Sequence, residues 1–144
     1  MIFEVENKKV FSSDVGKTFD KNKHTIILLH GSGQSHVVWS LTDQYLADKG
    51  YNVFALDLPG HGNSEGSSLK SIEDMADWLN KLVRVIGIKD LTLLGHSQGC
   101  LIALEYLNKF PANIKNLIFV AGSYQIPVNQ SLIELASSGD LESL

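Results

Sequence analysis

Four short runs of apolar residues, each followed by a glycine-containing loop, constrain the fold of this chain more than any other feature. The runs cover residues 25–29, 51–56, 91–94 and 116–121. They are continuously apolar, a pattern that indicates strands buried on both faces, as in a parallel sheet covered by helices. Residues 2–6 and 9–11, around Asn7-Lys8, predict a short hairpin before the first run.

Helical patterns fill two of the segments between these runs. Residues 72–86 place apolar side chains three or four positions apart, which predicts an amphipathic helix. The segment 71–74 has serine followed three residues later by aspartate, a capping box, and Gly87 suits the end of the helix. A second capping box at 40–43 predicts a helix that ends near Gly50.

A third helix is expected over about 98–109, and its first turns are apolar nearly all round, as in a helix at the centre of a protein. Strands that alternate with helices predict an α/β fold with a doubly wound, mostly parallel sheet. We interpret residues 1–144 as one domain, with the sheet and helices in 1–122 and the start of a lid segment in 123–144.

Composition excludes several classes of function. Twelve Lys and Arg against sixteen Asp and Glu give a net charge of −4, so no basic surface for nucleic acid is expected. The longest aliphatic run, 26–29, is too short to span a membrane, and the acidic first residues do not resemble a signal peptide. A single cysteine, Cys100, excludes an internal disulfide or a cysteine-based zinc site. A cytoplasmic location is expected.

The pentapeptide 95–99, GHSQG, lies directly between a predicted strand and the apolar third helix. A strand-to-helix turn of this kind exposes its central serine at the edge of the sheet, next to the free N–H groups that begin a helix. The two glycines remove side chains that would collide across the turn. Ser97 is therefore the candidate nucleophile.

Two further loops follow predicted strands. Residues 30–33 read HGSG, and residues 57–64 read DLPGHGNS. Together with GHSQG, these loops resemble the α/β-hydrolase superfamily, in particular its lid-bearing serine esterases and lipases. The resemblance extends from the hairpin to Gly122. It implies a serine hydrolase in which Ser97 attacks a carbonyl carbon.

By the same resemblance, the backbone N–H groups of Ser32 and Gln98 form the oxyanion hole. Cys100 stands where many relatives have a second glycine, so some crowding of the helix against a strand is expected. Serine at position 97 argues against the branches that use a carboxylate nucleophile. No metal and no cofactor are expected.

The other candidate residues are interpreted as structural. His96 and His30 are expected to brace nearby loops, and His61 to shape the fold behind the site. His24 and His36 are expected to be solvated. Structural roles are also expected for Asp57, which would cap a turn, for Cys100 as a buried side chain, and for Trp39 and Trp78 in the core or near substrate.

A serine nucleophile needs a histidine base and an orienting carboxylate, and in this fold both follow the serine in the chain. All five histidines precede Ser97, and the acids that follow it are Glu105, Glu134, Asp140 and Glu142. We expect the side chain of Glu105 to face away from the site. Loss of the histidine from a serine triad lowers kcat by about 10⁶.

These observations leave three hypotheses. The first is a serine hydrolase for small carboxylic esters or related acyl compounds, represented by the N-terminal half of a sheet truncated after its sixth strand. The second is a non-catalytic binding module. The third is a half-enzyme completed by another chain, through the apolar sheet edge at 117–120, which could also favour self-association.

Overall fold

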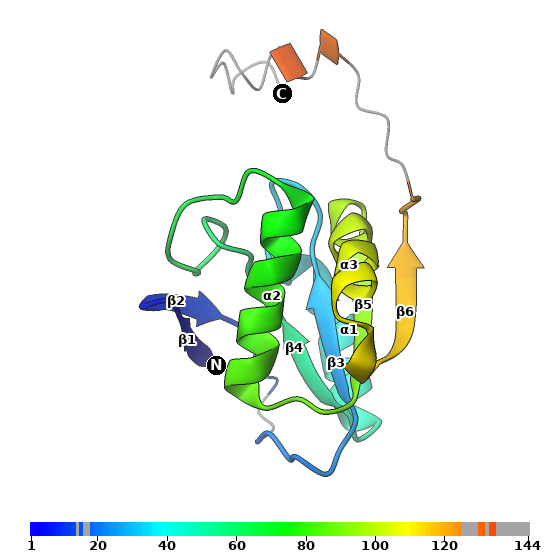
Figure 1. Cartoon of the computed structure of the whole chain (residues 1–144). Coiled ribbons are helices and arrows are strands. Elements are labelled where there is room, and N and C mark those ends of the chain that lie inside the picture. Colours follow the sequence, from blue (N-terminus) through cyan, green and yellow to red (C-terminus); the bar gives the residue numbers. More distant parts are fainter. Residues whose placement is uncertain (14, 16–17, 125–129, 132, 135–144) are drawn as a thin grey trace.

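A parallel sheet with strand order β4-β3-β5-β6 forms the centre of the molecule (Figure 1). The computed structural model describes residues 1–13, 15, 18–124, 130–131 and 133–134. The strands of this sheet are β3 (Thr25–Leu29), β4 (Asn52–Ala55), β5 (Leu91–His96) and β6 (Ile114–Val120). All three pairings between them are parallel, so the predicted doubly wound sheet is confirmed.

A separate antiparallel hairpin precedes the sheet. Its strands are β1 (Ile2–Val5) and β2 (Lys8–Phe11), and the turn residues Glu6 and Asn7 have φ values of 52° and 60°. The hairpin was predicted, but its turn lies one residue earlier than Asn7-Lys8. Two consecutive residues with positive φ match the right-handed twist of the strands that they join.

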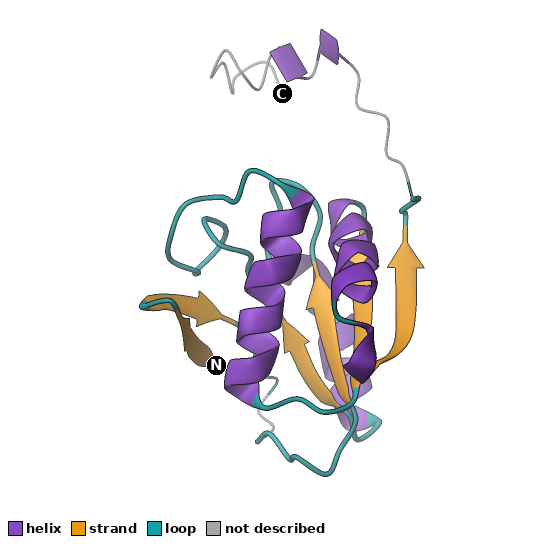
Figure 2. Cartoon of the chain, in the orientation of Figure 1, coloured by secondary structure: helices purple, strands orange, loops and turns teal. Residues whose placement is uncertain are grey.

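Helices cover both faces of the sheet (Figure 2). The α-helices are α1 (Thr42–Asp48), α2 (Ile72–Ile86) and α3 (Gln98–Lys109), and the 3-10 helices are η1 (His36–Trp39) and η2 (Pro111–Asn113). Figure 1 shows α2 and α3 on one face and α1 on the other. Within the described residues, α3 runs over β5 and β6, which places it at the centre of the molecule as predicted.

The start and end of α2 follow the sequence pattern. Ser71 is extended, and its hydroxyl accepts a hydrogen bond from the Asp74 N–H at 3.0 Å. Gly87 ends the helix with φ 78°, a conformation that costs glycine little. Both predicted boundaries of this helix are confirmed.

The predicted capping box at the start of α1 is wrong. Ser40 has helical φ and ψ because it ends η1, whereas an N-cap residue needs an extended backbone. The residue before α1 is Leu41, which makes no side-chain cap. Asp43 instead accepts hydrogen bonds from the Ser13 hydroxyl at 2.7 Å and from the Gln44 N–H at 2.6 Å. The end of the helix near Gly50 is as expected.

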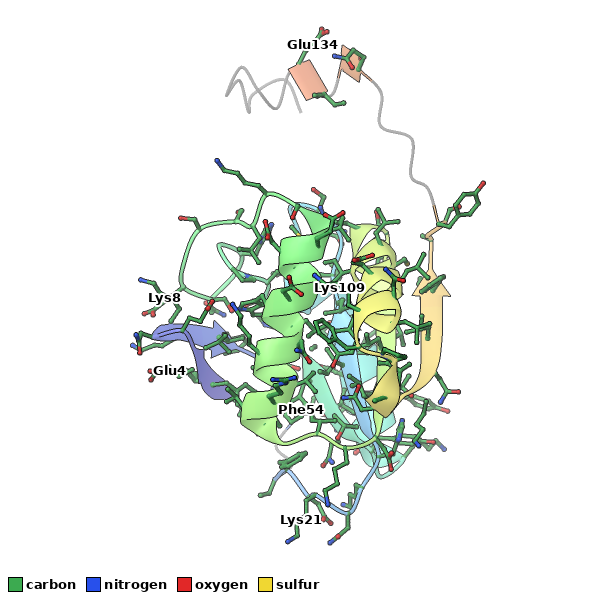
Figure 3. All side chains as sticks on the ribbon, in the orientation of Figure 1. Glu4, Lys8, Lys21, Phe54, Lys109 and Glu134 are labelled. Carbon is green, nitrogen blue, oxygen red and sulfur yellow. The ribbon has the colours of Figure 1, made fainter. Side chains whose placement is uncertain are left out.

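Alternate residues of the strands pack against different helices. Ile27, Phe54 and Leu93 belong to the larger apolar cluster, which also contains side chains of α2 and α3. Figure 3 shows Phe54 within the space between β4 and α2. Leu28 and Ala55 point the other way, into a smaller cluster with Trp39 of η1 and Ala47 of α1. Burial of both faces explains the continuous apolar runs.

The described helices include none that is both long and apolar enough to cross a membrane. The expected lid segment, 123–144, falls largely outside the described residues. Of it the structure describes 123–124, 130–131 and 133–134, and the last two stretches are helical.

Candidate active site

Ser97 lies at the turn between β5 and α3 in a backbone conformation that is rare for a residue with a side chain. Its φ is 51° and its ψ is −116°. Such a conformation costs about 1–3 kcal/mol and persists only where the surrounding structure holds it. The Ser97 N–H donates to the Val120 carbonyl at 3.1 Å, and the Ser97 carbonyl accepts from the Cys100 N–H at 2.9 Å. Strand β6 and helix α3 therefore hold the strained residue.

The glycines on either side of Ser97 are sterically required. A methyl group on Gly95 would collide with the Gly99 carbonyl and the Cys100 nitrogen, and one on Gly99 would collide with the Leu29 carbonyl. Backbone atoms cannot rotate away as a side chain can. The expected reason for the glycine spacing is thus confirmed.

The loop after β3 reaches the turn through Gly31. A methyl group built on Gly31 would lie 3.2 Å from Ser97 Cβ, so this glycine packs directly against the candidate nucleophile. The Gly31 carbonyl accepts from His30 Nδ1 at 2.7 Å and from the Gln34 N–H at 3.3 Å. The loop is fixed at the point where it meets Ser97.

The N–H groups of Ser32 and Gln98 have no hydrogen-bond partner among the residues that the structure describes. Gln98 is the first residue of α3, where the N–H groups carry the positive end of the helix dipole. Ser32 is exposed and follows the fixed Gly31. Both groups are free to donate to a ligand, and their role as oxyanion donors remains a prediction.

His30 is buried and braces two loops, as expected. Its Nδ1 donates to the Gly31 carbonyl, and its Nε2 accepts from the Leu58 N–H at 3.1 Å. Both nitrogens are thus occupied in the neutral ring. Burial lowers the pKa of His30 by more than its hydrogen bond to the Gly31 carbonyl raises it; His61 and His36 lower the pKa further, and Asp57 raises it. The ring therefore stays neutral near pH 7, but it is not available as a base because its acceptor nitrogen, Nε2, is already bonded to Leu58.

His61 and His96 also make hydrogen bonds to loops. His61 Nδ1 donates to the Pro59 carbonyl at 3.0 Å. His96 Nδ1 lies 3.0 Å from Gln34 Oε1, and its ring packs edge-on against Trp39. The expected contact of His96 with a nearby loop is confirmed.

The expectation that His24 and His36 are solvated is wrong, because each pairs with a residue distant in the chain. His24 Nε2 lies 2.7 Å from Thr92 Oγ1. His36 Nδ1 lies 2.9 and 3.0 Å from the two carboxylate oxygens of Asp57. Both rings are half-buried.

Asp57 does more than cap its own turn. Its buried carboxylate accepts the expected local hydrogen bond, from the Asn63 N–H at 2.8 Å, but also one from the His36 N–H at 2.6 Å. A side chain on Gly62 would overlap the carboxylate. The loop 57–64 is therefore joined to η1.

Cys100 is buried, as expected, and burial raises the pKa of its thiol. Its Sγ donates to the Gly95 carbonyl at 3.1 Å. A methyl group on Gly122 would overlap Sγ. The crowding expected at Cys100 is therefore accommodated at Gly122, just after β6. Trp39 and Trp78 are both buried in the core.

The acids that follow Ser97 do not complete a triad within the described residues. Glu105 accepts from Asn108 Nδ2 at 3.3 Å on α3, and Glu134 accepts from Gln130 Nε2 at 3.4 Å. Asp140 and Glu142 lie outside the described residues. The part of the chain that the structure covers has no cluster of three potential metal ligands.

Gln34 was not identified from the sequence. Its Oε1 lies 3.0 Å from both the Gly31 nitrogen and His96 Nδ1, so it joins the loop after β3 to the turn that holds Ser97. A glutamine in a polar loop gives no pattern that distinguishes it from a solvated residue. Only the folded arrangement reveals this contact.

Comparisons with known proteins agree with this geometry. The family model described as alpha/beta hydrolase fold matches residues 24–141. A hydrolase of (E)-2-((N-methylformamido)methylene)succinate from Acinetobacter baylyi is 30% identical over 101 residues, which cover 69% of this chain and 38% of the relative. A pimeloyl-[acyl-carrier protein] methyl ester esterase from Aeromonas hydrophila is 37% identical over 98 residues, covering 68% and 37%.

Among solved structures, a carboxylesterase of the thaumarchaeon Nitrososphaera gargenis matches with a TM-score of 0.82 and 22% identity. That match covers 98% of this chain and 52% of the esterase. The chain thus spans between about a third and a half of the length of these three proteins. The parallel sheet, the turn at Ser97 and the family match over residues 24–141 agree, and the chain belongs to the alpha/beta hydrolase fold family.

Proposed function

We propose that this chain carries the nucleophile and the oxyanion-binding part of a serine hydrolase for carboxylic esters or related acyl compounds. The observation that carries the proposal is the strained Ser97, which packs against Gly31 and is followed by Gln98. The N–H groups of Gln98 and of Ser32, the residue after Gly31, lack partners among the described residues. Esterases among the relatives support the substrate class.

In the proposed reaction, Ser97 Oγ attacks the carbonyl carbon and the alcohol leaves, forming an acyl-serine that water then hydrolyses. The N–H groups of Ser32 and Gln98 would stabilise the negative oxygen of each tetrahedral intermediate. Each donor of this kind typically contributes a factor of about 10²–10³ to the rate. The electrostatic effect of the α3 N-terminus acts in the same direction.

A base for Ser97 is not supplied by the histidines of this chain. His30 has both ring nitrogens occupied, and the other four each bond to a group other than Ser97. We therefore expect slow turnover by these 144 residues alone. About 10³–10⁴ of rate enhancement over water can remain from oxyanion binding when a triad is incomplete.

Covalent labelling tests this proposal without requiring turnover. The chain is treated with a fluorophosphonate, and modified serines are mapped by mass spectrometry, with Ser97→Ala as the variant. We expect label at Ser97 and much less at Ser67 and Ser68, which lie in an ordinary loop. Equal labelling of all three serines would contradict the proposal.

Chemical rescue provides a second measurement. Imidazole in solution can act as the absent base, so ester hydrolysis by the chain should rise with imidazole concentration. The Ser97→Ala variant measures the direct hydrolysis by imidazole. Identical rates for the two proteins at every concentration would exclude catalysis by Ser97.

Completion by another chain is a second candidate, and the exposed edge of β6 favours it. Ile118, Phe119 and Val120 are 44%, 41% and 42% exposed. A further strand, from a separate polypeptide that also brings the acid and histidine, would cover them. Ester hydrolysis that appears only when such a polypeptide is added would support this candidate.

A further inference from the structure

The side chain of Gln34 connects the two loops that meet at Ser97. Its Oε1 lies 3.0 Å from the Gly31 nitrogen and 3.0 Å from His96 Nδ1. Gly31 belongs to the loop after β3, and His96 is the last residue of β5. One amide oxygen is therefore shared by the proposed oxyanion loop and the residue before the nucleophile.

These contacts determine which His96 nitrogen carries a proton. A backbone N–H can only donate, so the Gln34 atom beside Gly31 is the acceptor oxygen. The same oxygen cannot donate to His96, and Nδ1 must therefore carry the hydrogen. Trp39 packs against the ring at 86°, with 6.3 Å between ring centroids. The His96 ring is thus fixed in tautomer by Gln34 and in orientation by two neighbours.

Gly31 is held on both sides of its backbone. Gln34 accepts from the Gly31 N–H through its side chain and donates to the Gly31 carbonyl through its own N–H at 3.3 Å. In a trans peptide the next N–H points opposite to that carbonyl. The direction of the Ser32 N–H is therefore set by the hydrogen bonds that fix the Gly31 carbonyl.

The same contacts set the distance between the loop and the nucleophile. A methyl group on Gly31 would lie 2.9 Å from Gln34 Oε1, 3.1 Å from His96 Nδ1 and 3.2 Å from Ser97 Cβ. These three groups converge on one glycine. Displacement of the Gln34 amide would let Gly31, and with it Ser32, move away from Ser97.

We propose that Gln34 is a positioning residue, whose side-chain amide fixes the His96 tautomer and holds the Ser32 N–H at the distance from Ser97 that oxyanion binding needs. This inference rests on the proposed function for its catalytic consequence. The hydrogen bonds of Gln34 Oε1 to the Gly31 N–H and to His96 Nδ1, called the clamp below, can be measured independently of any reaction.

The experiment compares Gln34→Leu, which removes the acceptor, with Gln34→Glu, which keeps an acceptor oxygen at the same position. Gln44→Leu is the matched control, because Gln44 is exposed on α1, away from Ser97, and its side-chain amide donates to Asp48 Oδ1 at 3.1 Å. Nitrogen-15 NMR reports the His96 tautomer, amide hydrogen exchange reports the Gly31 N–H, and fluorophosphonate labelling reports the reactivity of Ser97.

In Gln34→Leu we expect loss of the Nδ1–H preference of His96 and faster exchange at Gly31, by about fivefold, since a hydrogen bond contributes about 1 kcal/mol. Labelling of Ser97 should slow by about tenfold, because small displacements of positioned groups have effects of this size or larger. Gln34→Glu should keep the Nδ1–H preference of His96 and the slow exchange at Gly31, because it retains the acceptor oxygen. Gln44→Leu should stay within about threefold of the unmodified chain in all three measurements.

An unchanged His96 tautomer and unchanged Gly31 exchange in Gln34→Leu would overturn the clamp. A changed tautomer with unchanged labelling would overturn the positioning role. Failure of the unmodified chain to label at Ser97 would instead contradict the proposed function, and the two NMR measurements would still decide whether the clamp exists.

Discussion

The two edges of the central sheet differ, although both strands are apolar. At β4 the chain covers its own edge: the Ser13 N–H donates to the Ala55 carbonyl at 3.0 Å, and the Asp57 N–H donates to the Phe11 carbonyl at 2.9 Å. Ser12 pairs with Leu56 in an isolated antiparallel bridge. Every residue of β4 is buried.

Strand β6 has a partner on one side only among the described residues. It pairs with β5, and α3 packs along it, yet none of its residues is fully buried. Figure 1 shows β6 at the border of the sheet, away from the hairpin. Its backbone nevertheless holds Ser97 through the Val120 carbonyl.

The comparison shows that the candidate nucleophile, Ser97, bonds to the less protected edge. The loop after β3 lies on the protected side, and the turn at Ser97 bonds to β6. A segment that covered β6 would stabilise the strand that holds Ser97. Four predictions test this difference between the edges, in order of decreasing effect on the free energy of unfolding.

The largest effect is expected from Asn52→Ala at the protected edge. The Asn52 amide donates to the carbonyls of Asp20 and Lys23 and to Thr25 Oγ1, and its oxygen accepts from the Asp20 N–H. Truncation removes the partner of the buried Thr25 hydroxyl and of three partly buried backbone groups, at about 1–3 kcal/mol for each group that water cannot reach. Chemical denaturation should show a loss of about 3 kcal/mol in total.

Asn116→Ala on β6 is the matched control for that variant. Its amide donates one hydrogen bond, to Thr92 Oγ1 at 3.2 Å, from an exposed position. We expect a loss of about 0.5–1 kcal/mol. A similar loss in both variants would contradict the difference between the edges.

The next effect is expected at the contact that joins the end of β6 to α3. In Gly122→Ala the new methyl group would overlap Cys100 Sγ, and overpacking of this kind costs about 1–3 kcal/mol. Cys100→Gly should restore much of the loss in the double variant, since it removes the side chain that collides. Thermal unfolding of both single variants and the double variant measures the coupling; simple additivity would contradict it.

A smaller loss of stability is expected at low pH, and it involves His30 at the end of β3, the strand beside the protected edge strand β4. Because burial lowers the pKa of His30, the folded protein resists its protonation, and stability is lost as pH falls below about 6.5, the ordinary pKa of the unfolded residue. Protonation also removes the acceptor of the Leu58 N–H. We expect the Tm to fall by a few degrees between pH 7 and pH 5.

His30→Asn separates this effect from that of other groups. Its side-chain amide can still donate to the Gly31 carbonyl, but it does not titrate. Part of the decrease in Tm with acid should disappear in this variant, while Asp57, His36 and His61 remain. An unchanged pH dependence would rule out His30 as its source.

The smallest effect on unfolding is expected from Ile118→Lys at the open edge. The side chain is 44% exposed, so its replacement should change the free energy of unfolding by no more than about 0.5 kcal/mol. Self-association through the edge should decrease, because lysine on an edge strand opposes pairing with another chain. Sedimentation of the two proteins over a range of concentrations measures self-association; equal association would place the contact elsewhere.

Much of the fold could be predicted because it depends on local patterns. The continuous apolar runs predicted the strands, and the spacing of apolar residues in 72–86 predicted α2 with both its ends. The error at Ser40 has a local cause, since η1 occupies the preceding residues and gives Ser40 a helical backbone. The same serine pattern succeeds at Ser71, where the chain enters the helix from an extended segment.

The site was predicted less completely. The glycine spacing identified Ser97, because the collisions that the glycines avoid lie at the turn and at the strand beside it. The sequence predicted solvated positions for His24 and His36 and gave no signal for Gln34, since each has a partner in a distant segment of the chain. His36, for example, bonds to Asp57, which lies 21 positions along the chain.

The sequence by itself determined the buried parallel strands, the amphipathic α2 and the strained turn at Ser97, because short-range sterics and the period of apolar residues decide these features. Only the tertiary structure decided the clamp of Gln34 on His96, the neutral tautomer of His30 and the difference between the edges at β4 and β6. Those depend on hydrogen bonds and packing between segments far apart in the chain, and no local pattern encodes which groups will meet.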